Sequence, residues 1–268
     1  MPIANDQRRD GHEEFFFWPE EPEHGRLAIG GAEAKHISRV MRHRPGDRVA
    51  VTDGAGNEHQ VELTDVSPST VSGKVLSTAQ RPREPRHRVV LAQAILKGDK
   101  LATVVEQAAE LGVSEIVPLL TARTIGRLTA AREQRLRKVA LSGMKSSTGA
   151  VLLKLEPAMD LGRLSERIRA CDQTLVAYED ERHATLAETL RPRVDSVMIV
   201  IGPEGGFEPE EIALLRTAGA AVFGMGPRRL RAETASLVAT AAAMQLLGDL
   251  SDKRDKLTNS KGGVIGSW

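Results

Sequence analysis

Two glycine-bearing turns near the carboxyl end constrain the fold more than any other feature of the chain. The first turn, IGPEGGF at residues 201–207, follows the apolar run 196–200. The second turn, MGPRRLR at residues 225–231, follows the apolar run 220–224 and leads into a helical segment. Strand–turn–helix units of this kind predict an open α/β sheet, in which ligand crevices form at the carboxyl ends of the strands.

The composition of these turns points to a ligand. Glycine lets the backbone approach a ligand closely, and the helix after each turn offers free N–H groups. Either turn alone is also typical of a tight strand-to-helix connection. Two such turns in successive units favour a small-molecule pocket built mainly from main chain.

Residues 87–248 alternate apolar runs with amphipathic segments, which predicts a mostly parallel sheet covered by helices. The spacing of apolar residues in 100–111 predicts a helix with one buried stripe, ended by Gly112 as its C-cap. Further helices are expected through residues 132–145 and over 161–170. The expected strands are residues 89–96, 115–120, 152–155, 174–178, 196–200 and 220–224.

Residues 12–79 have a different rhythm, with short alternating runs separated by turn signals. Many short strands of this kind favour a small barrel, here with one helix over residues 33–43. The aromatic run 15–18 is interpreted as an edge strand packing on the barrel core rather than as a base-stacking surface. The expected strands are residues 15–18, 26–29, 47–53, 58–66 and 70–77.

A domain organisation follows from this change of rhythm. The segment 80–86 contains two prolines and four charged residues, which predicts an extended linker. We therefore expect a β-barrel domain over residues 1–80 and an α/β domain over residues 87–250. The polar, glycine-rich tail 251–268 is expected to be disordered or loosely docked.

Composition limits the class of protein. The net charge of the 268-residue chain is only +1, so bulk electrostatics does not by itself indicate nucleic acid. The single cysteine, Cys171, excludes a disulfide framework and fits a reducing compartment. Residues 1–10 lack the apolar stretch of a signal peptide, and the weakly polar segment 235–247 is too short to span a bilayer. A soluble, intracellular (cytoplasmic) protein is expected.

Several common sites are excluded by missing motifs. The chain has no P-loop sequence, no nucleophile elbow and no histidine or carboxylate set with metal-ligand spacing, so no metal is expected. The turn after the first α/β strand reads KGD at residues 97–99, not the glycine pattern of a dinucleotide site. What remains is a pocket of backbone groups, glutamate and arginine, which suits an adenosine-containing ligand without a polyphosphate.

The two turns resemble a known family signature. GPEGG at residues 202–206 and GPRRLRAETA at residues 226–235 resemble the paired motifs of the RsmE family, SPOUT-class methyltransferases that methylate N3 of a uridine in small-subunit (16S) ribosomal RNA. The two motifs together are a far stronger signal than either alone. Further matching segments are KGD at 97–99, EQAAELGV at 106–113, IVPL at 116–119, HISRVMR at 36–42 and GD at 46–47.

The resemblance carries expectations of fold and partners. It implies an α/β domain with a C-terminal trefoil knot, S-adenosyl-L-methionine bound bent within it, a PUA-like RNA-binding barrel and a homodimer. Periodicity does not reveal a knot, and knots are rare in proteins. The cofactor-binding residues that the resemblance implies are Gly202, Glu204, Gly205, Gly206, Met225, Gly226, Leu230, Arg231 and Thr234.

The chemistry assigns roles to particular side chains. Uracil N3 must lose a proton before or during methyl transfer, so Glu204 is a candidate proton acceptor, although it equally fits a role in orienting its loop. Arg231 is hypothesised to stabilise negative charge on the uracil carbonyls or to grip a phosphate. RNA phosphates are expected to contact exposed cations. These RNA-binding candidates are Arg39, Arg42, Arg44, Arg123 and Arg127.

One departure from the family pattern leaves alternatives open. Residues 145–149 read KSSTG where the family usually carries a Gln-Ser-x-Arg element, which puts the target base in question. One alternative is a knotted methyltransferase acting on another RNA base or on a ribose 2′-oxygen. The other is a non-catalytic RNA-binding paralogue.

Overall fold

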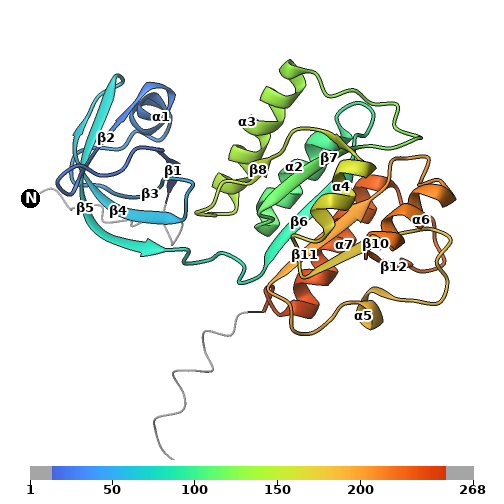
Figure 1. The fold of residues 1–268 in the computed structure, drawn as a ribbon. Helices are drawn as coiled ribbons and strands as arrows, with labels where there is room; N and C mark the ends of the chain where they lie inside the picture. The colour runs from blue at the N-terminus through green and yellow to red at the C-terminus, as the bar shows by residue number, and fades with distance from the viewer. Residues whose placement is uncertain (1–13, 252–268) are drawn as a thin grey trace, which may run out of the picture. The chain divides into compact units, whose positions relative to one another are not determined.

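The computed structural model describes residues 14–251, so the expectation for the tail from residue 252 onward lies outside the described residues. The chain divides into two compact units (Figure 1). The first contains the chain up to Glu84 together with Leu141–Leu152, and the second contains Pro85–Ala140 and the chain from Leu153. Among the described residues, no helix combines the length and the apolar character that crossing a bilayer requires.

The first unit is built on a curled five-stranded sheet in the order β1-β3-β4-β5-β2 (Figure 1). All neighbours are antiparallel except β1 and β3, which run parallel. β1 lies at an edge, and its Phe16 is buried in the core, as expected. The strands are β1 Phe15–Phe17, β2 Arg26–Gly30, β3 Arg48–Thr52, β4 Asn57–Val66 and β5 Thr70–Gln80.

The helix of this unit is shorter than the sequence pattern predicts. α1 spans Gly31–Lys35 and continues into a π-helical turn, η1, over His36–Val40. The wider turn arises because the Met41 N–H donates to the His36 carbonyl, at 3.0 Å, five residues back. Ala34 and Ile37 still reach the core of the sheet, so the apolar face of the predicted helix is retained.

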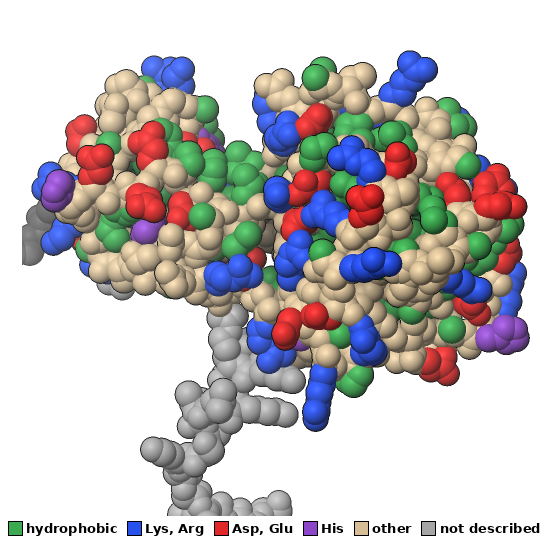
Figure 2. Space-filling model, in the orientation of Figure 1, with side chains coloured by type: hydrophobic (Ala, Val, Ile, Leu, Met, Phe, Trp, Pro, Cys, Tyr) green, Lys and Arg blue, Asp and Glu red, His purple; other side chains and the backbone are tan. Residues whose placement is uncertain are grey.

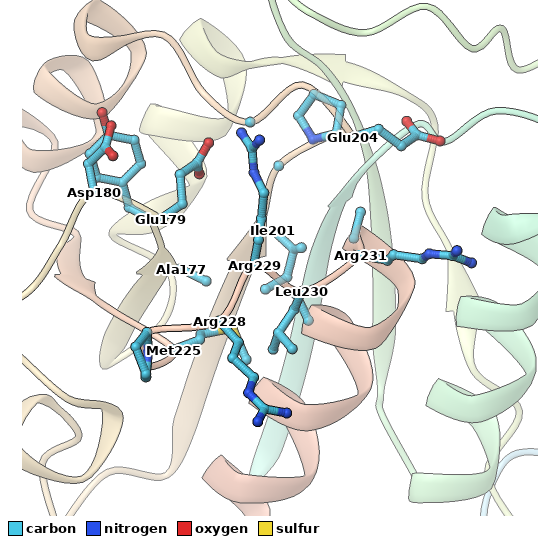
Figure 3. Close-up of a pocket in the computed structure, with 18 of the residues that line it drawn as sticks. Ala177, Glu179, Asp180, Ile201, Glu204, Met225, Arg228, Arg229, Leu230 and Arg231 are labelled. Carbon is cyan, nitrogen blue, oxygen red and sulfur yellow. The ribbon is translucent and has the colours of Figure 1, made fainter.

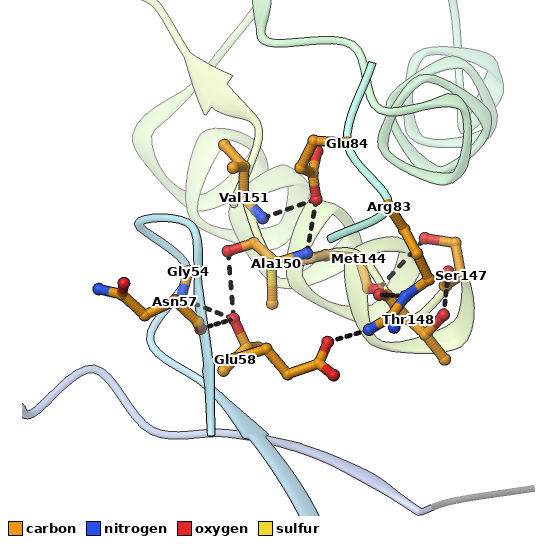
Figure 4. A network of polar contacts seen from close by, with 11 residues as sticks. Gly54, Asn57, Glu58, Arg83, Glu84, Met144, Ser147, Thr148, Ala150 and Val151 are labelled. Atoms are coloured by element: carbon orange, nitrogen blue, oxygen red, sulfur yellow. Dashed lines mark hydrogen bonds and ion pairs between the residues drawn. The ribbon is translucent and has the colours of Figure 1, made fainter. Parts of the chain in front are cut away.

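The grouping of Leu141–Leu152 with the first unit was not anticipated from the sequence. The Thr52 hydroxyl donates to the Ala150 carbonyl at 3.1 Å, and Glu84 accepts from the Ala150 and Val151 N–H groups at 2.6 and 3.1 Å (Figure 4). Lys145 forms an ion pair with Glu33 at 2.6 Å. Polar groups that lie far apart along the chain are thus paired with one another by hydrogen bonds and an ion pair.

The second unit is an α/β fold around a parallel seven-stranded sheet. Its order is β12-β10-β11-β6-β7-β8, with β9 also paired to β7, which confirms the predicted mostly parallel sheet. The strands are β6 Arg88–Ala94, β7 Glu115–Leu120, β8 Lys154–Leu155, β9 Met159–Asp160, β10 Gln173–Ala177, β11 Ser196–Ile201 and β12 Ala221–Phe223. The helices are α2 Lys100–Leu111, α4 Leu161–Ile168, α5 Leu186–Thr189, α6 Pro209–Thr217 and α7 Ala232–Leu247. Helix α3, Ala130–Ser146, begins in this unit, and its residues from Leu141 onward belong to the first.

Helices cover both faces of this sheet, because alternate residues of its buried strands point to opposite sides. In β6, Val90 and Ala92 belong to the core shared with α4 and α6. Leu91 lies instead beside Val104 of α2 and Leu237 of α7. The strands are therefore fixed between two layers, and their carboxyl ends all open at one edge.

A glutamate at the amino ends of the strands links three elements. Glu115, at the start of β7, accepts hydrogen bonds from Arg88 of β6 and Arg167 of α4. Partial burial acts to raise the pKa of the Glu115 carboxyl, but hydrogen bonds and the charges of the two arginines outweigh it and lower that pKa below 4.5.

We expect Glu115→Gln to lower the free energy of unfolding at pH 7 by about 2 kcal/mol, since charge-assisted hydrogen bonds are lost. Because the folded-state pKa is lowered, this contribution is complete above pH 4.5 and is lost as the pH falls through the folded value. Urea denaturation across this range measures it, with exposed Glu110→Gln as the control. A difference from wild type that stays constant down to the lowest pH contradicts the assignment.

Candidate functional site

The two glycine turns line one cavity of about 570 Å³ in the second unit (Figure 3). The first turn follows β11 and the second follows β12, while the segment after β10 forms a further wall. β10 pairs with both β11 and β12, so its carboxyl end lies between the two turns. Parallel pairing thus brings segments separated in the sequence to one pocket.

Most residues expected to bind a cofactor are at this cavity. Those that line it are Gly202, Glu204, Gly206, Met225, Gly226, Leu230 and Arg231. Gly205 and Thr234 are not among the lining residues. Thr234 is exposed in the first turn of α7, and its neighbour Ala235 lines the cavity instead, because successive helical residues point in different directions.

Gly206 is the most constrained of the turn glycines. Its φ is +73°, in the left-handed region that side chains disfavour. A Cβ at this position would lie 2.0 Å from a carboxylate oxygen of Glu179. Gly206 therefore meets two requirements together, the reversal of the chain and the close approach of Glu179.

Gly205 makes room for an arginine rather than for the cavity. The Arg123 side chain packs against Gly205, where a Cβ would lie 3.2 Å from the Arg123 Cβ. Arg123 donates to the Gly205 carbonyl at 2.6 Å and to the Glu208 carboxylate at 2.7 Å. This predicted RNA contact is thus occupied in holding the first glycine turn.

Glu204 is held by the loop after β6. Its Oε1 accepts from the Lys97 N–H at 3.2 Å and from the Lys100 ammonium at 3.1 Å. Burial acts to raise the pKa of Glu204, but these contacts and one with its own N–H outweigh it and lower the pKa below its usual value. A carboxylate with a lowered pKa is a poorer proton acceptor, so the geometry favours the loop-orienting role.

The segment after β10 supplies pocket residues that sequence reasoning missed. Glu179 and Asp180 line the cavity, and Figure 3 shows both on the side opposite Glu204. The pKa of the Tyr178 hydroxyl is raised by burial and by the neighbouring Asp180 carboxylate. The Glu179 carboxylate has no hydrogen-bond partner among residues 14–251. The available signal was a charged run, 179–182, directly after a predicted strand.

Three arginines of the second turn provide positive charge at the cavity. Arg228, Arg229 and Arg231 all line it and are exposed. Within the part of the chain that the structure describes, none of the three forms an ion pair. Their guanidinium groups are therefore available to an anionic ligand, and of the three only Arg231 was assigned a role from the sequence.

The remaining RNA-binding candidates are on the surface of their own units. Arg39, Arg42 and Arg44 are exposed in the first unit, and Arg127 is exposed in the second. Arg42 has a φ of 60°, a rare conformation for a residue with a side chain. On the face drawn in Figure 2, basic and acidic side chains lie interspersed, in keeping with the small net charge.

The altered element at residues 145–149 does not line the cavity. The Lys145 ammonium is bound to Glu33, and the Thr148 carbonyl accepts from Arg83 at 3.0 Å (Figure 4). Its polar groups therefore serve contacts within the first unit. No cluster of three or more potential metal ligands lies within residues 14–251.

Comparison with known sequences matches both units. A family model described as an RNA methyltransferase domain matches residues 82–244, and one described as an RNA methyltransferase PUA domain matches residues 29–76. Ribosomal RNA small subunit methyltransferase E of Bacillus subtilis is 31% identical over 227 residues, which cover 81% of this chain and 88% of that protein. The protein of the same name from Mycobacterium tuberculosis is 28% identical over 82% of this chain and 87% of its own length.

Solved structures agree with these matches. The ribosomal RNA small subunit methyltransferase E of Neisseria gonorrhoeae, bound to S-adenosyl methionine, superposes with a TM-score of 0.81 at 26% identity, covering 88% of this chain and 98% of that one. A probable rRNA-methyltransferase from Porphyromonas gingivalis gives 0.78 at 28% identity, with the same coverage. The expected combination of a SPOUT α/β domain and a PUA-like N-terminal domain is confirmed. The chain belongs to the RNA methyltransferase family that includes ribosomal RNA small subunit methyltransferase E, the RsmE family.

Proposed function

We propose that this protein transfers a methyl group from S-adenosyl-L-methionine to N3 of a uridine in small-subunit (16S) ribosomal RNA. The observation that carries the proposal is the meeting of both glycine turns in one cavity of about 570 Å³. This volume lies within the roughly 300–1,000 Å³ of small-molecule sites. A relative of similar fold holds this cofactor, and the related proteins are named as small-subunit ribosomal RNA methyltransferases.

The residues at the cavity fit such a cofactor. Gly206 lets the Glu179 carboxylate approach the first turn closely, and Met225 and Leu230 offer apolar surface to an adenine ring. The free Glu179 carboxylate can accept hydrogen bonds from ribose hydroxyls or from an ammonium group. When bound, the cofactor supplies an electrophilic methyl group on a sulfonium centre.

Arg231 and Glu204 take different parts in the proposed reaction. Arg231 lines the cavity without an ion pair, so its guanidinium can stabilise the negative charge that develops on the uracil carbonyls. Glu204 is bound to Lys97 and Lys100, so we assign it to holding the first glycine turn. The N3 proton would then pass to water, and positioning of the nucleophile in line with the methyl group supplies much of the acceleration.

The RNA is proposed to contact exposed cations of both units, with Arg39, Arg42 and Arg44 in the first and Arg127 in the second. The role expected of Arg123 is indirect, because this side chain already supports Gly205.

The family resemblance also supports a cytoplasmic homodimer whose α/β domain contains a C-terminal trefoil knot. Exposed apolar side chains on and just after α7 are in keeping with a subunit interface: Val238 and Leu246 are 44% and 52% exposed, and Leu250 is 43% exposed.

The proposal is tested with small ribosomal subunits that lack the modification. After incubation with labelled S-adenosylmethionine, the RNA is hydrolysed and its nucleosides are separated. N3-methyluridine is the expected product. A ribose-methylated nucleoside or another methylated base would indicate one of the alternative enzymes, and absence of label together with absence of cofactor binding would indicate a non-catalytic paralogue.

Gly206→Ala is expected to weaken binding of S-adenosylmethionine at least about tenfold, because the new methyl group displaces the Glu179 carboxylate and strains the turn. Gly219→Ala is the matched control, since Gly219 also has a positive φ, +104°, but open space around it and no place at the cavity. Both variants should lose about 1 kcal/mol of stability from backbone strain. Calorimetry measures the affinity of both variants for S-adenosylmethionine, which should fall only in Gly206→Ala. Equal affinities would contradict the placement of Gly206 in the cofactor site.

Arg231→Ala is expected to lower kcat/KM by a factor of about 100 or more, the effect of removing a donor that acts on developing charge. Exposed Arg163→Ala on α4 serves as the control. Turnover near that of wild type would remove Arg231 from the mechanism.

Glu204→Gln is expected to raise KM for the cofactor, because the ion pair with Lys100 is lost, while the pH profile of kcat keeps its shape. Steady-state kinetics across the pH range separates the two roles of this residue. Disappearance of the acidic limb in the variant would instead identify Glu204 as the proton acceptor.

Arg39→Gln and Arg44→Gln are each expected to weaken RNA binding and to reduce the slope of log affinity against log salt by about one. Arg48→Gln is the control within the same unit, because Arg48 already faces Glu62 at 3.7 Å. Filter binding at several salt concentrations measures the slopes. Slopes equal to that of the control would exclude these two arginines from the interface.

A further inference from the structure

Gln93 is a polar residue in the middle of the second unit's core. It lies in β6, whose sequence RVVLAQA is otherwise apolar after its first residue, and its exposed fraction is 0%. β6 is an inner strand, paired with β11 on one side and β7 on the other. An amide placed here loses its hydration, so its hydrogen-bond partners decide whether the position is tolerated.

The partners of Gln93 fix the orientation of its amide. Its Nε2 donates to the Ala94 carbonyl at 3.0 Å and to the Gly202 carbonyl at 3.4 Å. Its Oε1 accepts from the hydroxyl of buried Ser236. The reverse orientation would set the amide oxygen against two carbonyl oxygens, so the assignment of nitrogen and oxygen is determined by the surroundings.

These contacts join the two glycine turns. Gly202 opens the first turn, directly after Ile201, which is the register partner of Gln93 in β11. Ser236 lies in the first turns of α7, just after the second glycine turn. One buried side chain thus holds the start of one turn and the helix that leaves the other.

Other buried polar side chains of this unit lack such partners. The hydroxyls of Thr174 and Thr240, also buried in this unit, have no hydrogen-bond partner among the described residues. Thr240 follows Ser236 by one turn of α7, on the same buried face of the helix. This face therefore holds an unpaired hydroxyl one turn away from the hydroxyl that Gln93 binds. The three hydrogen bonds of Gln93 therefore distinguish it from these buried hydroxyls.

We propose that Gln93 is a positioning residue of the cofactor pocket: through Gly202 and Ser236 it sets the separation of the two glycine turns. The inference rests on the proposed function, because it assumes that these turns hold S-adenosylmethionine. Gln93 does not line the cavity and acts only through the backbone that it anchors.

The test compares Gln93→Met, which keeps side-chain length but removes the donors, with Ser236→Ala and the double variant. Thr240→Val, which alters a buried hydroxyl without a partner, is the control. Binding of S-adenosylmethionine is measured by calorimetry well below every melting temperature, so that all proteins are folded. We expect about a tenfold loss of affinity in Gln93→Met, a smaller loss in Ser236→Ala and none in the control.

Two further readouts separate positioning from a merely structural role. In the double variant the losses should not add, because both substitutions break the same link. KM for the cofactor should rise while kcat changes little. Melting temperatures that fall without any change in affinity would overturn the inference, and if Gln93→Met fails to fold, Ser236→Ala retaining wild-type affinity would do the same.

The wild-type protein distinguishes the two levels of the proposal. Failure of the wild type to bind S-adenosylmethionine would overturn the proposed function, and the inference with it. Binding by the wild type that is equal in Gln93→Met and Ser236→Ala would overturn only the role of Gln93.

Discussion

Parallel pairing of β10 with both β11 and β12 is the constraint on which the rest of the site depends. Strands in a parallel sheet present all their carboxyl ends at one edge, and β10 lies between the two strands that carry the glycine turns. The two turns therefore converge, and the charged segment after β10 closes the space between them. Helices pack on both faces of the sheet, so the loops that form the site lie at this edge.

The loops at this edge are held by side chains from other elements rather than by their own sequence. Arg123 supports the carbonyl of Gly205, Lys100 pairs with Glu204, and Gln93 binds the carbonyl of Gly202. The glycines admit these close approaches, and the supporting side chains limit the conformations that the glycines would otherwise allow. A pocket formed mostly of main chain becomes preorganised in this way, which lowers the cost of ordering it on binding.

Local patterns identified most of the elements. The stripe of apolar residues in 100–111 and its glycine cap correspond to α2, which ends at Leu111 before Gly112 in a left-handed conformation. The runs 115–120 and 174–178 correspond to β7 and β10 within a residue or two. The glycine pair signalled the pocket, because two such turns in successive units favour close approach of the backbone to a ligand. The grouping of residues 141–152 with the first unit escaped prediction, since it depends on contacts such as that of Thr52 with Ala150, 98 positions apart.

The sequence by itself determined the alternation of strands and helices, the two glycine turns and the family that they indicate, because these are encoded in spacings of a few residues. Only the tertiary structure decided which charged groups the cavity contains and which are already engaged. The order of the strands in the sheet places Glu179 at the cavity and brings Arg123 to the carbonyl of Gly205, to which it donates. That order arises from the packing of distant segments, which local periodicity does not record.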